Sequence, residues 1–259
     1  MSHDPLDGID VAPVLPEARQ IVHRAAETYL RHTAPWFIGL MLHGSALKGG
    51  YLPGGSDIDL QLYLKDAAFG PDGQLPLYMG MAIHRELAAI DVTPFSYIQC
   101  YPLKTSLEGR EDWVGPIPGA FHLVAGRLPI AAATADQLRD QAHRRLSDPR
   151  PVHTSVANEL LGHGAGNLAR RVRLLLTEVW PVLYQVLTCS TDDPLAVWRL
   201  PKDRAIELLP AEDLPGREIR RVYAAAHTYY AGNQSVPQGL QVLLDGVAFL
   251  QAAATWYRR

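Results

Sequence analysis

The sequence predicts an α+β protein in which a mixed β-sheet with helices comes first and a helical bundle follows. Short apolar runs at residues 36–42 and 58–64 indicate buried strands on either side of a glycine-rich loop. From residue 134 onward the strand signals stop, and apolar residues recur at helical spacing. We therefore expect two domains, residues 1–133 with the sheet and residues 134–259 with the helices.

Composition excludes several classes of protein. Among 259 residues, 47% are hydrophobic and 20% charged, as in soluble globular proteins. The net charge of -3 and the absence of a basic stripe argue against a nucleic-acid partner. The start lacks a secretory signal and no apolar run approaches a bilayer span of ~20 residues, so we expect a cytoplasmic location and no membrane partner. Cys100 and Cys189 have no disulfide or zinc spacing.

The first half supplies the remaining sheet and its helices. Residues 16–32 place apolar side chains at helical spacing, and residues 77–89 predict a second helix. A third strand is predicted to start at residues 90–93 and run toward Tyr101. Because Pro94 interrupts it, this strand should be short or lie at the edge of the sheet. The fourth strand is predicted at residues 120–126.

The second half predicts a bundle of helices. Its longest amphipathic stretch carries leucines and valines at i, i+3, i+4 and i+7 spacing, with arginines on the other faces. The predicted helices span residues 134–146, 168–187, 201–209, 215–230 and 238–257.

A polar motif lies between the first two predicted strands. Gly44 and Ser45 follow the first strand, and Asp57 and Asp59 open the second. Carboxylates at positions i and i+2 of a strand share one face and repel each other unless a cation lies between them. Magnesium suits such a pair, because substrate phosphates complete its coordination. Glycines let backbone N–H groups approach a polyphosphate, so this hairpin predicts both a metal site and a phosphate cradle.

This motif resembles the signature of the nucleotidyltransferase superfamily, whose members include polymerase β. Gly44-Ser45, eleven further residues and Asp57-Ile58-Asp59 between aliphatic flanks carry the resemblance. It implies that the N-terminal domain is a polymerase β-like nucleotidyltransferase fold. Gly44, Ser45 and Ser56 would then bind the nucleotide, and Asp57 and Asp59 would hold one or two Mg²⁺ ions. Asp91 would be the third carboxylate, acting as general base or metal ligand.

A second resemblance concerns residues 177–210. They are similar to the helical domain of the aminoglycoside adenylyltransferases that act on streptomycin and spectinomycin. The resemblance implies that Lys202 binds the nucleotide phosphates, and that Trp113 is a candidate for contact with the acceptor. A cationic acceptor would favour carboxylates, and Glu178 is a candidate of that kind. Residues 204–206, Arg-Ala-Ile, depart from the family, which has a tryptophan there.

Together these features predict a magnesium-dependent adenylyltransferase. We expect it to move AMP from ATP, its co-substrate, to a hydroxyl of a small molecule of the aminoglycoside type. Two alternatives stay open. The acceptor could be a protein or another metabolite, or the chain could be a catalytically silent nucleotide-binding module. The sequence also leaves the oligomeric state, the acceptor and the preferred nucleotide undecided.

Overall fold

The computed structural model describes residues 8–105, 114–147 and 155–259, apart from residue 165. Contacts divide the chain into two compact units, Met1–Ala133 and Thr134–Arg259. The predicted α+β class with a mixed sheet is confirmed.

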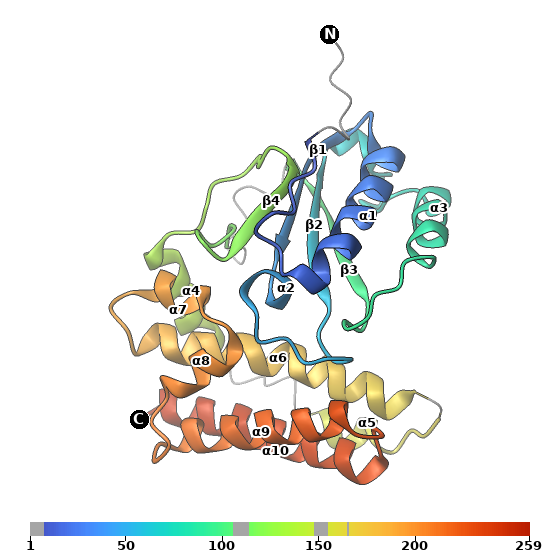
Figure 1. Ribbon diagram of the computed structural model, residues 1–259. Helices are drawn as coiled ribbons and strands as arrows, with labels where there is room; N and C mark the ends of the chain where they lie inside the picture. Colours follow the sequence, from blue (N-terminus) through green and yellow to red (C-terminus); the bar gives the residue numbers. More distant parts are fainter. Residues whose placement is uncertain (1–7, 106–113, 148–154, 165) are drawn as a thin grey trace. The chain divides into compact units, whose positions relative to one another are not determined.

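The first unit is built on a four-stranded sheet with the order β3-β2-β1-β4. Strand β1 pairs antiparallel with both β2 and β4, whereas β2 and β3 are parallel, and the helix α3 connects these two parallel strands (Figure 1). The predicted pair of strands around the glycine-rich loop therefore lies at the centre of the sheet. The strands are β1 (Phe37–His43), β2 (Ile58–Leu64), β3 (Ile98–Lys104) and β4 (Phe121–Gly126).

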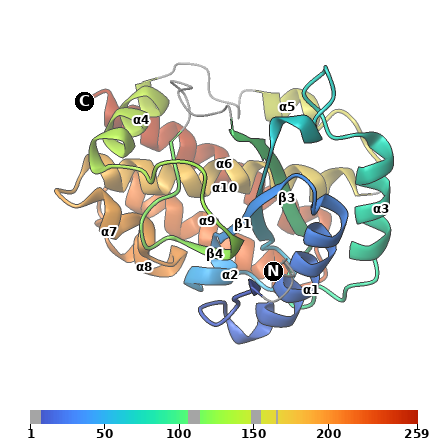
Figure 2. The same ribbon diagram turned by 90° about the horizontal axis from the view of Figure 1, so that it is seen from above.

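Two helices, α1 (Pro16–Thr33) and α3 (Leu77–Leu87), cover one face of this sheet, and they lie side by side in both views (Figures 1 and 2). Helix α1 begins with Pro16, whose fixed φ suits a first turn, and its last turn carries basic residues that interact favourably with the helix dipole. Two short helical turns, α2 (Ser45–Lys48) and the 3-10 turn η2 (Asp66–Ala68), complete the unit.

The strands alternate between an apolar and a partly polar face. Leu40, Leu42, Leu60 and Leu62 point toward α1 and α3, where the main core forms. The opposite face has only a small apolar cluster, in which Met41, Tyr63 and Ile130 are buried. The rest of that face carries polar side chains, and the predicted site lies among them.

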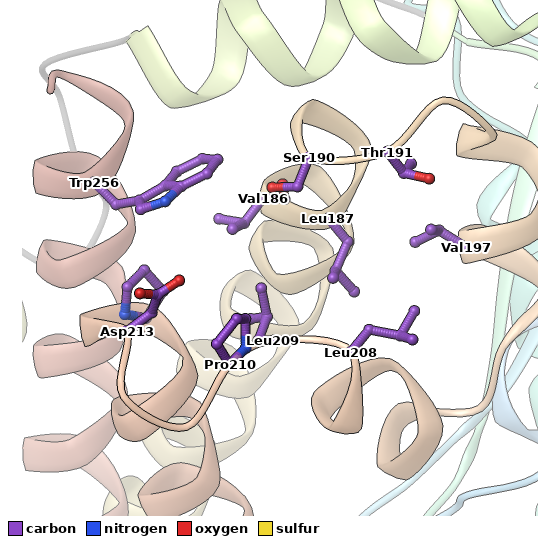
Figure 3. Close-up of a pocket in the computed structure, with 11 residues that line it drawn as sticks. Val186, Leu187, Ser190, Thr191, Val197, Leu208, Leu209, Pro210, Asp213 and Trp256 are labelled. Carbon is purple, nitrogen blue, oxygen red and sulfur yellow. The ribbon is translucent and has the colours of Figure 1, made fainter.

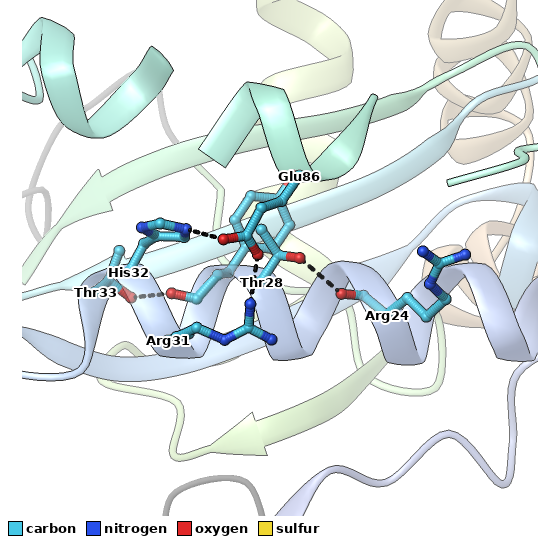
Figure 4. Close-up of polar contacts among 7 residues, drawn as sticks. Arg24, Thr28, Arg31, His32, Thr33 and Glu86 are labelled. Carbon is cyan, nitrogen blue, oxygen red and sulfur yellow. Dashed lines mark hydrogen bonds and ion pairs between the residues drawn. The ribbon is translucent and has the colours of Figure 1, made fainter. Parts of the chain in front are cut away.

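An ion-pair cluster at the surface ties α3 to α1 (Figure 4). The carboxylate of Glu86 on α3 accepts from Arg31 Nη1 at 2.6 Å and pairs with His32 Nε2 at 2.8 Å, both on α1. The hydrogen bond to His32 and the charge of Arg31 lower the pKa of Glu86 below its usual value. Thr28 Oγ1 donates to the Arg24 carbonyl oxygen within α1.

The third strand differs from its prediction in position. It begins at Ile98 rather than at residues 90–93, so Asp91 lies in the segment between α3 and β3. Proline has no N–H for a strand ladder, and the segment around Pro94 instead forms turns, in which the Pro94 carbonyl oxygen accepts from Gly54 N–H at 2.7 Å.

The described residues of the second unit form helices. Helix α6 packs against α4 and α10, and α10 packs against α9. A capping box of Ser235 and Gln238 begins α10. The helices are α4 (Ala135–Ser147), α5 (Val156–Glu159), α6 (Asn167–Cys189), α7 (Pro194–Arg199), α8 (Lys202–Glu207), α9 (Leu214–Ala231) and α10 (Val236–Tyr257).

Helix α6 is the one helix among the described residues that is long and apolar enough to cross a membrane. The sequence analysis had expected no such stretch. However, 61% of its most apolar window is buried inside the protein, and its buried residues recur at helical spacing. The apolar character of α6 is therefore accounted for by its central place among α4, α7 and α10.

The close packing of the backbone at Gly39 in β1 can be tested by substitution. A Cβ atom there would lie 2.1 Å from the Arg127 carbonyl oxygen, so Gly39→Ala should lower the free energy of unfolding by about 1–3 kcal/mol. Urea denaturation measures this. Gly80→Ala in α3 is the control, because a Cβ there meets nothing within 4 Å. It should raise stability by about 0.5–1 kcal/mol. Equal effects of the two substitutions would contradict the packing described.

Candidate active site

The Gly-Ser pair lies where β1 ends and the short helix α2 begins. Gly44 has a φ of 78°, in the left-handed region that favours glycine. A Cβ atom on Gly44 would lie 2.2 Å from Oδ2 of Asp59. The carboxylate of Asp59 therefore lies directly against the backbone of Gly44, in a space that any side chain would fill. Two motifs separated in sequence thus meet at one point.

Ser56 closes the glycine-rich loop from within. Its Oγ accepts the Leu52 N–H at 2.8 Å, and the residue is 6% exposed. Its carbonyl oxygen accepts from both the N–H and the hydroxyl of Ser96, which precedes β3. The structure thus assigns Ser56 a loop-closing hydrogen bond. Its predicted nucleotide contact stays a prediction.

Asp57 and Asp59 are half-buried and lie at the beginning of β2. The pKa of the Tyr101 phenol on β3 is raised, mainly by burial and to a smaller extent by the negative charges of Asp59 and Asp57. Both carboxylates therefore act on Tyr101. Positions i and i+2 share a sheet face, so the two carboxylates and the phenol lie on the same side of the sheet, opposite the main core.

His43, the last residue of β1, is paired in register with Asp59. Burial and the nearby charge of Lys48 lower the pKa of His43 to about 4, although Asp57 acts in the opposite direction. The imidazole is therefore neutral at pH 7. Its Nε2 lies 3.5 Å from Gln61 Nε2, the next residue along this face of β2. The sequence analysis did not assign His43 to the site.

Strand β3 contributes a hydrogen-bonded row of side chains that the sequence analysis missed. Tyr97 donates its hydroxyl proton to Gln99 Oε1 at 2.5 Å, and Gln99 Nε2 donates to the Tyr101 hydroxyl oxygen. Gln99 is paired in register with Asp59, so this row lies beside the carboxylates. The spacing Tyr-x-Gln-x-Tyr was the available signal, because alternate residues of a strand share one face.

Asp91, the predicted third carboxylate, is not grouped with Asp57 and Asp59. Within the described residues, no three His, Cys, Asp or Glu side chains lie close enough together to hold a metal ion. Asp91 is exposed, and its Oδ1 accepts the Thr93 N–H at 3.0 Å, a bond that lowers the pKa of the carboxyl. The role of Asp91 as a third carboxylate stays a prediction. In register with Asp59 stands the neutral amide of Gln99.

Two carboxylates are nevertheless a sufficient protein ligand set for magnesium. Mg²⁺ keeps several waters and is bound in phosphate-transferring sites by one or two carboxylates together with substrate phosphates. Asp57 and Asp59 supply this donor set, and the space at Gly44 lets Asp59 approach the backbone. The residues present fit a magnesium ion whose coordination a nucleotide completes.

The remaining predicted residues belong to the second unit or are not described. Lys202 begins α8, and its Nζ lies 5.5 Å from the centroid of the Trp180 ring. Its predicted contact with the nucleotide stays a prediction. Glu178 pairs with Arg145 Nη2 at 2.7 Å, so its charge is partly balanced within the helical unit. Trp113 lies outside the described residues.

Comparison with known proteins finds a likeness among solved structures. No family model matches the sequence, and no curated protein gives a significant match. Among solved structures, the chain is similar to spectinomycin adenyltransferase AAD(9) from Enterococcus faecialis, crystallised with ATP and spectinomycin. The identity is 13%, the TM-score is 0.48, and the match covers 89% of this chain and 98% of that chain. A likeness at this level carries no argument about substrate or mechanism, which rest on the residues above.

The loop-closing role of Ser56 can be tested by stability. Ser56→Ala would leave the buried N–H of Leu52 without its acceptor, so the free energy of unfolding should fall by about 1–3 kcal/mol. Ser45→Ala is the matched control, because Ser45 is equally buried and its hydroxyl makes no hydrogen bond within the described residues. Chemical denaturation should show the smaller loss for Ser45→Ala. The reverse order would contradict this role.

Proposed function

We propose that this protein is a nucleotidyltransferase that moves AMP from ATP to a hydroxyl group in a magnesium-dependent reaction. The observation that carries the proposal is the contact between Gly44 and the carboxylate of Asp59. It brings a glycine-serine turn of the kind that approaches phosphates against a pair of carboxylates of the kind that holds a divalent cation.

The residues would divide the work between positioning and charge. Asp57 and Asp59 would hold one or two Mg²⁺ ions, which neutralise the charge of the triphosphate when bound. The backbone at Gly44 and the hydroxyl of Ser45 would contact the phosphates. Such transfer needs little covalent chemistry from the protein, and orientation of the nucleotide supplies much of the rate.

Strand β3 would contribute donors beside this site. The Tyr101 oxygen accepts a hydrogen bond from Gln99, which leaves the phenolic proton to be donated outward. Tyr101 is 52% exposed, so a ligand can reach it. We propose that it donates to an oxygen of the nucleotide or of the acceptor. The predicted role of Asp91 as general base or metal ligand is tested by the substitution Asp91→Asn.

For the acceptor we propose a small molecule of the aminoglycoside type. This rests on the resemblance of residues 177–210, and the nucleotide half of the proposal does not depend on it. Magnesium-dependent pyrophosphate release from ATP, measured with streptomycin, with spectinomycin and with no acceptor, tests both halves. ATP binding without turnover for any acceptor would favour a catalytically silent nucleotide-binding module. Turnover only with another metabolite or with a protein would identify that molecule as the acceptor in place of an aminoglycoside.

Removal of either carboxylate charge should abolish most activity. Asp57→Asn and Asp59→Asn keep side-chain size but weaken cation binding, so pyrophosphate release should fall by a factor on the order of 10²–10³. Circular dichroism should show an intact fold. Asp91→Asn is the matched control, because its Oδ1 can still accept the Thr93 N–H. It should retain activity, and a loss equal to that of Asp57→Asn would restore Asp91 to the site.

Gln99→Glu tests the metal role of the carboxylate pair by a different measurement. The substitution would place a third carboxylate in register with Asp59. Without a cation this carboxylate would repel Asp57 and Asp59, and with Mg²⁺ bound it would be a further metal ligand. The melting temperature should therefore fall in chelator and rise more steeply with added Mg²⁺ than in the unaltered protein. An unchanged magnesium response would argue against a cation beside Asp59.

A further inference from the structure

A cavity of about 390 Å³ lies wholly within the helical unit, among α6, α7, α9 and α10 (Figure 3). Its size falls within the range of small-molecule sites, roughly 300–1,000 Å³. The proposed nucleotide transfer uses none of its residues. The lining consists of Val186, Leu187, Ser190, Thr191, Val197, Leu208, Leu209, Pro210, Asp213, Pro215 and Trp256.

Aliphatic side chains form part of the cavity wall, beside polar groups. Val186 and Leu187 from the end of α6, with Val197 from α7, are buried aliphatic side chains. Trp256, near the end of α10, presents its indole on one side of the cavity in Figure 3. Such walls favour a ligand with a hydrophobic body, because burial of apolar surface drives its binding.

The two hydroxyl groups of the lining already have partners in the protein. Ser190 Oγ donates to the Val186 carbonyl oxygen at 2.9 Å, and Thr191 Oγ1 accepts the Asp193 N–H at 3.2 Å. Neither hydroxyl gives the cavity a charge preference.

Asp213 is the one charged residue of the lining. It stands at the N-cap of α9 but does not cap the helix with its side chain. Within the described residues, its carboxylate makes no hydrogen bond or ion pair. The nearby arginines are engaged elsewhere, since Arg217 pairs with Glu218 and Arg220 donates to the Leu209 carbonyl oxygen. Asp213 is exposed, so its negative charge at the edge of the cavity is available to a ligand.

We propose that this cavity binds a small organic ammonium ion with an apolar body. The carboxylate of Asp213 would pair with the cation, and the aliphatic walls would bury the body. Figure 3 draws Asp213 and Trp256 on the same side of the cavity. An indole face attracts cations through its quadrupole, so Trp256 reinforces the preference for positive charge.

Three ligands of similar shape and different charge test the proposal: phenethylamine, phenethyl alcohol and phenylacetate. Isothermal titration calorimetry with the full-length protein should show binding of the amine at least about tenfold tighter than of the alcohol, which corresponds to ~1.4 kcal/mol. Phenylacetate should bind more weakly still. Failure of the amine to bind, or equal binding of the alcohol, would overturn the proposal.

Two substitutions assign the preference to this cavity. Asp213→Asn should remove the advantage of the amine over the alcohol, and Trp256→Leu should weaken amine binding while the protein stays folded by circular dichroism. Asp140→Asn is the charge-matched control, because Asp140 is an exposed acid of α4 outside the cavity. It should leave amine binding unchanged. Retention of the full preference in Asp213→Asn would refute the site, whereas magnesium-dependent turnover of ATP tests the other proposal separately.

Discussion

The contact between the Gly44 backbone and the Asp59 carboxylate is the constraint on which the rest of the first unit depends. It requires a residue without a Cβ at the end of β1, a left-handed backbone at that residue, and β2 in a fixed register beside β1. A register shift of one residue would turn Asp59 toward the apolar core, where an unpaired carboxylate is costly. The position of the Asp59 carboxylate at the site therefore depends directly on the register between β1 and β2.

The two faces of the sheet explain how this unit carries polar chemistry without losing its core. The leucines of β1 and β2 that face α1 and α3 supply the buried apolar surface. The opposite face is then free to carry Asp59, Gln61, Gln99 and Tyr101 in neighbouring rows. Hydrogen bonds along Tyr97, Gln99 and Tyr101 hold these three side chains in place, so they are arranged before a ligand arrives.

The helical unit shows the same separation of roles on a smaller scale. Most side chains that line the cavity are of the kind that any helical bundle buries. The Asp213 carboxylate, in contrast, has no partner among the described residues. The charge of Asp213 interacts favourably with the N-terminus of α9. The proposed ammonium ligand would pair with this same charge.

By itself, the sequence determined the α+β class, the two central strands and the meeting of a Gly-Ser turn with Asp59, because these features depend on local spacing along the chain. Tertiary structure alone decided which residue stands beside Asp59 on the next strand. Pro94 delays β3 to Ile98, and the parallel register with β2 then places Gln99 there instead of Asp91. Register between strands far apart in sequence depends on side-chain packing across the sheet, which spacing along one strand does not encode. The burial of Ser56 and the unpaired carboxylate of Asp213 were decided in the same way, by neighbours distant in sequence.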